Sequence, residues 1–449
     1  MAIIVAMLVS MVVVTLGATS VSLAIHNSEA SAHDRRRLQS VHAAEAGVNY
    51  YFSHLQSSGV NDFECSIGQA LTSTPPARFD ATISFYDAGG LQLPCPLNGV
   101  EPYSALIHSV GTTENAGPSR TMEALVNLVP LPGGPFGEYA IFSEGNPQFN
   151  SNVQVFGGEA VQGSVYSNGS VVLSSNSTIY GNIEAQGSVT LNSNAQVKRN
   201  VLAGTSVHLN SNASVFQDII ASNSSVSLGS NSRVFGGARA GTTITQGSGA
   251  TIDGTPVPNA PSAPPEYQSF PQLVFDSTAW QEAGYSVQSF SSCADAKTFM
   301  AGIASGNHAV RISGACDLSY SSNEEVSVKG NLAIVSNGSL TMNSNTRFAN
   351  VGTNHNLYLL FGLGGSGSCN INFNQNSDVG AGLKTVFYTP CAIDMTSNTI
   401  VLEGQMFGGS VRFNSSTTLN YEPIGVPGYG ETTFDEDILY VREVTPSEA

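Results

Sequence analysis

Ser188-Val-Thr-Leu-Asn-Ser-Asn-Ala-Gln-Val197 recurs almost unchanged as Ser206-Val-His-Leu-Asn-Ser-Asn-Ala-Ser-Val215, and this repeated motif decides the fold. In each copy, apolar residues alternate with polar ones on both sides of an Asn-Ser-Asn triplet. Such alternation, interrupted by Asn, Gly and Ser turns, predicts short β-strands. The last Asn of the triplet steps along the chain by 24, 18, 18 and 19 residues. The triplets and their close variants are Asn150-Ser-Asn152, Ser174-Ser-Asn176, Asn192-Ser-Asn194, Asn210-Ser-Asn212 and Gly229-Ser-Asn231.

A repeat of about 18 residues without a helical period predicts a β-solenoid, in which each turn of chain forms one rung. We therefore expect a mainly β protein with a right-handed parallel β-helix, its strands stacked about 4.8 Å apart around inward Val, Leu and Ile. Asn suits the corners because its side chain bonds the turn backbone and because it tolerates left-handed dihedral angles. Stacked corner residues can also bond from rung to rung. The expected ladder consists of Asn152, Asn176, Asn194, Asn212 and Asn231.

A second stretch repeats the pattern less regularly and is either a second solenoid or a continuation of the first. Its triplets are Asn343-Ser-Asn345, Asn374-Gln-Asn376, Thr396-Ser-Asn398 and Asn414-Ser-Ser416. A short helix is expected over Cys293–Ile303, with Ala294, Phe299 and Ile303 on one face. The predicted division of the chain is a helix at 1–58, a small β-rich connecting region at 59–140, the solenoid at 141–254, a Pro-rich linker at 255–271, a small α/β insert at 272–320, the second solenoid stretch at 321–425 and a tail with a final strand at 426–449.

The N-terminal segment predicts one long helix. Met1 to Ile25 contains no charged residue, and such a helix is long enough to cross a hydrocarbon core of about 30 Å. A secretory signal peptide fits less well, because no basic residue precedes the apolar run. Beyond the apolar run, helical spacing continues to about residue 55, and the predicted apolar face comprises Leu38, Val41, Val48, Phe52 and Leu55.

This layout resembles a type IV pilin, and more narrowly a PilX-type pilin-like protein. The resemblance is carried by Ala43, Ala44, Glu45, Ala46 and Gly47, within the longer pattern Ala-Glu-Ala-Gly-Val-Asn-Tyr-Tyr. It implies that a leader peptide is removed, so that Met1 is the first mature residue, and that the helix packs with neighbouring helices in a filament core. The implied assembly residues are Met1, Ile3, Ile4, Val5, Leu8, Val12, Leu16 and Gly17. Most pilins carry Glu at the fifth mature position, so Val5 favours a minor or tip subunit. The solenoid itself resembles bactofilin-type β-helices in rung length.

Six cysteines, none in a CxxC arrangement, indicate disulfides in an oxidising, extracytoplasmic compartment. Six cysteines allow 15 connectivities. We expect the sequential one, because each pair then closes a local loop worth about 3 kcal/mol in the chain-entropy model. The expected pairs are Cys65 with Cys95, Cys293 with Cys316, and Cys369 with Cys391.

Composition argues against nucleic-acid binding and against catalysis. Charged residues make up only 11% of the chain, and Lys+Arg 16 against Asp+Glu 33 gives a net charge of −17, the opposite of a phosphate-binding surface. No metalloprotease, nucleophile-elbow or phosphate-loop motif is present. The solenoid carboxylates do not recur at one place in successive rungs; they are Glu159, Glu184, Asp218 and Asp253. We expect no catalytic residue, no metal and no cofactor.

The leading hypothesis is a structural subunit of a type IV pilus-like extracellular filament. The subunit would associate with copies of itself or with other pilin-like subunits through the N-terminal helix, reside in the cytoplasmic membrane before assembly, and display the solenoid at the cell surface. One alternative is a membrane-anchored adhesin that binds a polysaccharide or a partner cell. A third is a β-helix enzyme that degrades polysaccharide.

Overall fold

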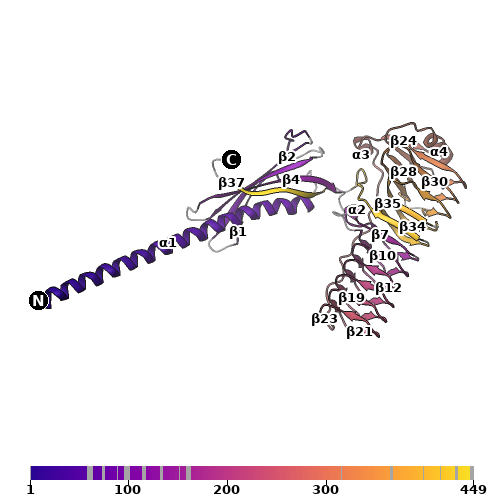
Figure 1. Cartoon of the computed structure of the whole chain (residues 1–449). Coiled ribbons are helices and arrows are strands. Elements are labelled where there is room, and N and C mark those ends of the chain that lie inside the picture. The colour runs from indigo at the N-terminus through magenta and orange to yellow at the C-terminus, as the bar shows by residue number, and fades with distance from the viewer. Residues whose placement is uncertain are drawn as a thin grey trace. The chain divides into compact units, whose positions relative to one another are not determined.

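A computed structural model describes most of the chain, which forms two compact units (Figure 1). One unit comprises Met1–Leu131 with Glu431–Ala449, and the other Pro132–Gly430. The described residues are 2–57, 64–72, 76–87, 89–95, 102–113, 118–131, 135–150, 152–157, 163–314, 316–364, 368–397, 399–414, 416–429 and 433–444. Within the first helix, side chains are described for Met11, Leu16 and residues 19–55.

The first unit is one long helix on an antiparallel sheet. Helix α1 runs from Ala2 to Ser57, as the N-terminal pattern predicts. The sheet has the order β1-β2-β3-β4-β37, and all its neighbouring strands are antiparallel. Its strands are β1 (Ser66–Leu71), β2 (Ala77–Tyr86), β3 (Ser104–Thr113), β4 (Arg120–Leu131) and β37 (Thr433–Val444). Buried and exposed residues alternate along β2 and β3, so one face of the sheet meets the helix.

The helix face that meets the sheet differs from the predicted one. Val48 and Leu55 are buried as expected, but Leu38 is 58% exposed and lies outside the contact. The buried face consists largely of small residues, which a search for large apolar side chains overlooks. Its members are Ser40, Ala43, Ala44, Gly47, Val48, Tyr51 and Leu55.

The second unit is an insertion between two neighbouring strands of this sheet. Leu131 at the end of β4 pairs with Thr433 at the start of β37, so the chain leaves the sheet and returns to it at adjacent positions. Insertions are tolerated where the two ends of the inserted domain lie close together. The final strand predicted for the C-terminal tail, 426–449, is β37, and it belongs to the sheet of the first unit.

The second unit is a parallel β-solenoid with three stacks of strands, called here faces A, B and C. Face A contains β24 (Ser286–Phe290), β25 (His308–Ile312), β28 (Leu332–Ser336), β31 (His355–Phe361), β34 (Leu383–Met395), β35 (Thr399–Phe413), β5 (Ile141–Ser143), β8 (Val165–Ser167), β11 (Ile183–Ala185), β14 (Val201–Ala203), β17 (Ile219–Ala221), β20 (Ala238–Ala240) and β23 (Pro256–Val257). Strands β34 and β35 are long and continue around the corners into other faces.

The other two faces follow the same order along the axis. Face B contains β26 (Leu318–Tyr320), β29 (Leu340–Met342), β32 (Ile371–Phe373), parts of β34 and β35, β6 (Gln148–Phe149), β9 (Val171–Leu173), β12 (Val189–Leu191), β15 (Val207–Leu209), β18 (Val226–Leu228) and β21 (Ile244–Gln246). Face C contains β27 (Glu325–Val328), β30 (Arg347–Asn350), β33 (Asp378–Val379), part of β35, β36 (Ser416–Tyr421), β7 (Gln154–Phe156), β10 (Thr178–Ile179), β13 (Gln196–Val197), β16 (Ser214–Val215), β19 (Arg233–Val234) and β22 (Thr251–Ile252).

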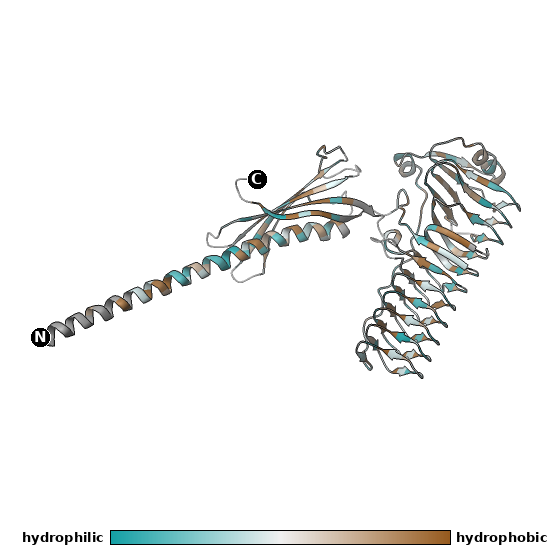
Figure 2. Ribbon diagram, in the orientation of Figure 1, coloured by the Kyte–Doolittle hydropathy of each residue, from teal (hydrophilic) through white to brown (hydrophobic). Residues whose placement is uncertain are grey.

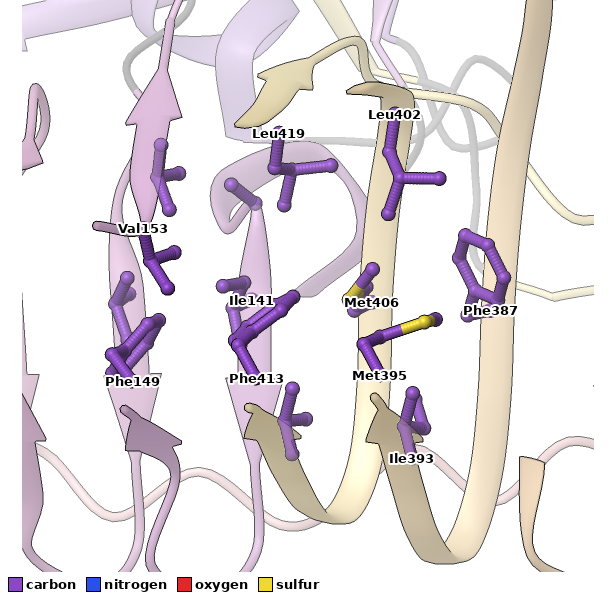
Figure 3. Close-up of a cluster of buried hydrophobic side chains, with 14 of the residues drawn as sticks. Ile141, Phe149, Val153, Phe387, Ile393, Met395, Leu402, Met406, Phe413 and Leu419 are labelled. Atoms are coloured by element: carbon purple, nitrogen blue, oxygen red, sulfur yellow. The ribbon is translucent and has the colours of Figure 1, made fainter. Parts of the chain in front are cut away.

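The two repeat stretches form one solenoid, joined in an order opposite to that of the sequence. The last rung of the second stretch stacks on the first rung of the first: Met406 pairs with Ile141, Phe413 with Phe149, and Leu419 with Val155. We call this junction the seam. Its inward side chains form one continuous core (Figure 3), in which the rings of Phe149 and Phe413 stack with centroids 5.5 Å apart. The continuation predicted from sequence is thus the correct alternative. The predicted insert, 272–320, contributes strands β24, β25 and β26 to the solenoid.

The two ends of the solenoid differ. At one end, helix α4 (Cys293–Gly302) buries Ala296 and Met300 against the core, whereas the predicted face had included Ala294. The cap of α4 is conventional, with the Ser292 hydroxyl accepting from the backbone N–H of Ala294 at 3.2 Å. At the other end, the short edge strand β23 begins with Pro256, which cannot donate to a further strand.

The predicted Pro-rich linker, 255–271, begins with strand β23, and its remainder belongs to an extended strap, residues 258–276, that returns along the solenoid from the β23 end toward β24. Ser222 Oγ donates to the carbonyl of Ala263 at 2.9 Å, Tyr166 OH to that of Glu266 at 2.9 Å, and Tyr388 OH to that of Pro271 at 2.7 Å. The strap therefore crosses the seam. It leads to helix α3 (Ser277–Glu282), and the short helix α2 (Pro135–Glu138) precedes the first rung.

Candidate functional site: the helix surface and the solenoid corners

The N-terminal half of α1 exposes apolar side chains. Leu16, Val21, Leu23 and Ile25 are each more than half exposed. Among the residues whose side chains are described, no helix is long and apolar enough to span a membrane. Met1 lies outside the described residues, and so do the side chains of most of the implied assembly positions, namely Ile3, Ile4, Val5, Leu8, Val12 and Gly17. Figure 2 accordingly leaves the first turns of α1 grey.

The pilin-like motif lies where the helix touches the sheet. Ala43 and Ala44 are fully buried, and a side chain at Gly47 would collide with the Ser109 hydroxyl. Glu45 faces outward and pairs with His42 at 3.0 Å, while Ala46 is half-buried. Small residues let the backbone of α1 approach the backbone of the sheet closely. In the folded subunit, this motif therefore packs the helix against the sheet.

The corner asparagines adopt the left-handed conformation that the sequence predicts. The dihedral angle φ is positive at Asn152, Asn176, Asn194, Asn212 and Asn231, between 42° and 61°. In the second stretch, φ is also positive at Asn345 and Asn376, and Asn398 lies outside the described residues. Asn323 shares this geometry with φ 66°, although it was not predicted; its Ser-Ser-Asn triplet matches the one that ends at Asn176.

The corner side chains bond from rung to rung. Asn194 Nδ2 donates to Asn176 Oδ1 at 3.2 Å, and Asn345 Nδ2 donates to Asn323 Oδ1 at 3.1 Å. A parallel ladder runs along the first Asn of the triplets, where Asn210 Nδ2 donates to Asn192 Oδ1 at 2.7 Å. This second ladder crosses the seam, because Asn150 Nδ2 donates to Asn414 Oδ1 at 2.8 Å. These bonds give the asparagines a structural role.

Face C carries an exposed aromatic ladder that sequence reasoning missed. The rings of Phe156 and Tyr180 stack with centroids 4.3 Å apart, and those of Phe216 and Phe235 with centroids 4.7 Å apart. Lys198 Nζ lies 3.9 Å from the centre of the Phe216 ring. The signal in the sequence is the recurrence of a large residue directly after the inward β-branched residue of each face C strand. Within this ladder each stacked ring covers the face of its neighbour.

The three disulfides join the cysteines in sequence order, as predicted. Cys65 pairs with Cys95 in the first unit, where the Tyr51 hydroxyl also donates to the nearby carbonyl of Glu64 at 2.9 Å. The other two pairs lie in the second unit: Cys293, at the start of α4, pairs with Cys316, and Cys369 pairs with Cys391 in the second stretch.

The candidate carboxylates are spread over different environments. Asp218 accepts from the backbone N–H of Gly237 at 2.6 Å, and Asp253 pairs with Arg233 at 2.6 Å. Glu184 lies half-buried on face A, where burial and the nearby Glu138 raise the pKa of its carboxyl. Glu159 lies outside the described residues. In the described part of the chain, no three His, Cys, Asp or Glu side chains lie close enough to hold a metal ion.

Comparisons with known proteins include a distant structural likeness. No protein-family model and no curated protein matches the chain. Among solved structures, the crystal structure of competence-associated pilin ComZ from Thermus thermophilus aligns with a TM-score of 0.30 at 12% sequence identity. The alignment covers 91% of this chain and 97% of that one. A likeness this weak assigns neither a family nor a function.

Proposed function

We propose that this protein is a pilin-like structural subunit of an extracellular filament, in a minor or tip position, that displays a β-solenoid. The observation that carries the proposal is the division of α1 into two halves. The C-terminal half is buried against the sheet of its own unit, whereas Leu16, Val21, Leu23 and Ile25 remain exposed. The free energy falls when a neighbour's apolar surface covers exposed apolar side chains and removes them from water.

The occupant we propose for this surface is the same helix half of neighbouring subunits. Met1 to Ile25 contains no charged side chain, so several such helices can pack together without burying an unpaired side-chain charge. Before assembly, lipid of the cytoplasmic membrane would cover the same surface. The resemblance to PilX-type proteins in Ala43–Gly47 agrees with this role, and Val5 favours a specialised subunit over a bulk one.

The remaining architecture is consistent with display. The solenoid is inserted at one hairpin of the sheet, so its rungs can extend without disturbing the helix-bearing unit. We take its coiling to be right-handed, because parallel strand crossovers are right-handed with rare exceptions. The solenoid carboxylates Asp218 and Asp253 make structural bonds, which favours a scaffold over an enzyme.

The test is whether the exposed helix half drives assembly. Deleting residues 1–25 should release a soluble, folded monomer, and Leu23→Asp should reduce surface filaments seen by electron microscopy. Leu91→Asp is the matched control, because Leu91 is a similarly exposed apolar residue of the same unit that lies outside α1. Filaments that still form after the deletion would show that α1 is not the filament core.

A further inference from the structure

A two-lobed groove lies beside the strap, close to the seam. One lobe has a volume of about 590 Å³ and the other about 440 Å³, and they adjoin at Gln272 and Pro390, which line both. Volumes of this order are typical of ligand sites. One lobe lies between the strap and Glu144, and the other reaches Asn337 and the Cys369–Cys391 disulfide.

Tyr267 forms part of the first lobe and presents an open aromatic ring. At 62% exposure, it is the most exposed aromatic side chain in the described part of the chain. Tyr180, in the face C ladder, is also exposed, but Phe156 covers a face of its ring. Among the described residues, no ring or cation lies against Tyr267. Its ring is therefore free to receive a ligand, whereas the ladder rings are occupied by one another.

Polar groups beside this ring are held in place. Tyr267 OH lies 3.5 Å from Glu144 Oε1, and Asn168 Nδ2 donates to Glu144 Oε2 at 2.7 Å. The Gln272 amide donates to the carbonyl of Phe270 at 3.3 Å, which orients its oxygen as an acceptor. Asn337 adds a second exposed amide in the other lobe. Glu144 is thus oriented while its carboxylate keeps lone pairs for further donors.

The lining selects against charged anions and against extended peptides. Among the described residues that line the groove there is no Lys, Arg or His, and the whole chain has a net charge of −17, so an anion would meet no countercharge from them. A peptide bound by strand addition needs a free backbone edge. Here the groove is bordered by Pro271 and Pro390, which have no N–H to donate.

We propose that this groove binds an uncharged oligosaccharide. A neutral sugar ring has an apolar C–H face that fits the open ring of Tyr267, and a rim of hydroxyl groups that donate to Glu144 and exchange hydrogen bonds with the amides of Gln272 and Asn337. The two lobes fit consecutive sugar units on either side of Gln272 and Pro390. This site goes beyond the filament role and does not depend on it, since every lining residue lies within the solenoid unit.

The test uses the full chain, purified in detergent, against a panel of neutral hexose and N-acetylhexosamine oligomers of two to six units, with uronic-acid and sialylated oligomers alongside. Binding to neutral oligomers is expected. Tyr267→Ala should weaken it at least tenfold, Tyr267→Phe should retain most of it because the ring remains, and Gln272→Ala should weaken it severalfold.

The control is Tyr180→Ala, which removes an exposed tyrosine from face C and should leave affinity unchanged. Circular dichroism of each variant verifies that the solenoid is intact. The proposal is overturned if no neutral oligomer binds, if acidic oligomers are preferred, or if Tyr180→Ala and Tyr267→Ala weaken binding equally. The oligosaccharide-binding result does not depend on whether the helix variants form filaments. Each of the two proposals can therefore be refuted without the other.

Discussion

The two halves of the solenoid reach the same geometry by different means. The half from β5 to β23, called here the regular half, has rungs of about 18 residues, apolar ladders such as Val189–Val207–Val226, and no disulfide. The half from β24 to β36, the reinforced half, has longer and unequal rungs. In compensation it carries two disulfides and an end-capping helix.

A second apolar layer lies mainly over the reinforced half and reaches Phe142 and Tyr166 in the first rungs of the regular half. On the outer side of face A, Tyr358, Tyr388 and Phe407 pack against the strap and α3 through Phe270 and Trp280. Burial raises the pKa of Tyr388 to about 12, so its hydroxyl keeps the proton that it donates to Pro271. Regular repeats can rely on nearest-neighbour stacking alone. Where rung length varies, disulfides and an outer apolar layer stabilise rungs that do not stack as regularly.

The largest expected effect comes from breaking the seam between the halves. Phe149→Ala removes a fully buried ring that stacks on Phe413, and we expect a loss of about 3–5 kcal/mol in the free energy of unfolding. The two halves should then unfold in separate steps as denaturant is added. Hydrogen exchange measured along the chain would show which half unfolds first. A single transition displaced by less than about 1 kcal/mol would show that the stacked Phe149 ring is not what couples the two halves.

The second prediction concerns the disulfides, which only the reinforced half of the solenoid carries. Replacing both Cys369 and Cys391 by Ser should cost about 3 kcal/mol, since the disulfide restricts the unfolded chain. Faster hydrogen exchange should appear in the reinforced half and spare the regular half. The matched double variant, with Cys65 and Cys95 both replaced by Ser, should speed hydrogen exchange only in the first unit. Faster exchange in the regular half, in either double variant, would contradict this comparison.

A smaller effect tests the corner asparagines. Asn194→Ala should cost about 1–2 kcal/mol, because alanine is strained at a φ of 59°. Asn194→Gly should cost less, since glycine adopts this conformation freely and loses only the side-chain bond to Asn176. Thermal unfolding of both variants gives their order of stability. Equal stability of the two variants would contradict the strain argument and assign the cost to the side-chain hydrogen bond, which both variants lose.

The smallest effect concerns pH. Because burial raises the folded-state pKa of Glu184, the unfolded chain releases this proton at lower pH than the folded one does. Stability contributed by the protonated group is therefore present at acidic pH and lost as pH rises through the folded pKa. Glu184→Gln should raise the melting temperature slightly at neutral pH and leave it unchanged in acid. A lower melting temperature at neutral pH would mean that the charged form is stabilised.

Local sequence predicted much of this fold. The alternating residues around Val189 and Val207, the left-handed corner at Asn194 and the order of the disulfides all follow from short-range patterns. The buried face of α1 was missed because it is built from small residues such as Ala44 and Gly47, which carry little hydrophobic signal. The aromatic ladder and the groove at Tyr267 were missed because they join residues from different rungs or from the strap.

Residue pattern alone decided that the chain builds rungs and an apolar-to-amphipathic helix, because strand alternation, corner geometry and helix periodicity act within a few residues. Tertiary structure alone decided how these parts connect. The joining of Ile141 to Met406, the pairing of Leu131 with Thr433 and the path of the strap bring together residues far apart along the chain. Such contacts depend on which exposed edges and apolar surfaces meet, and no short window of sequence contains both partners.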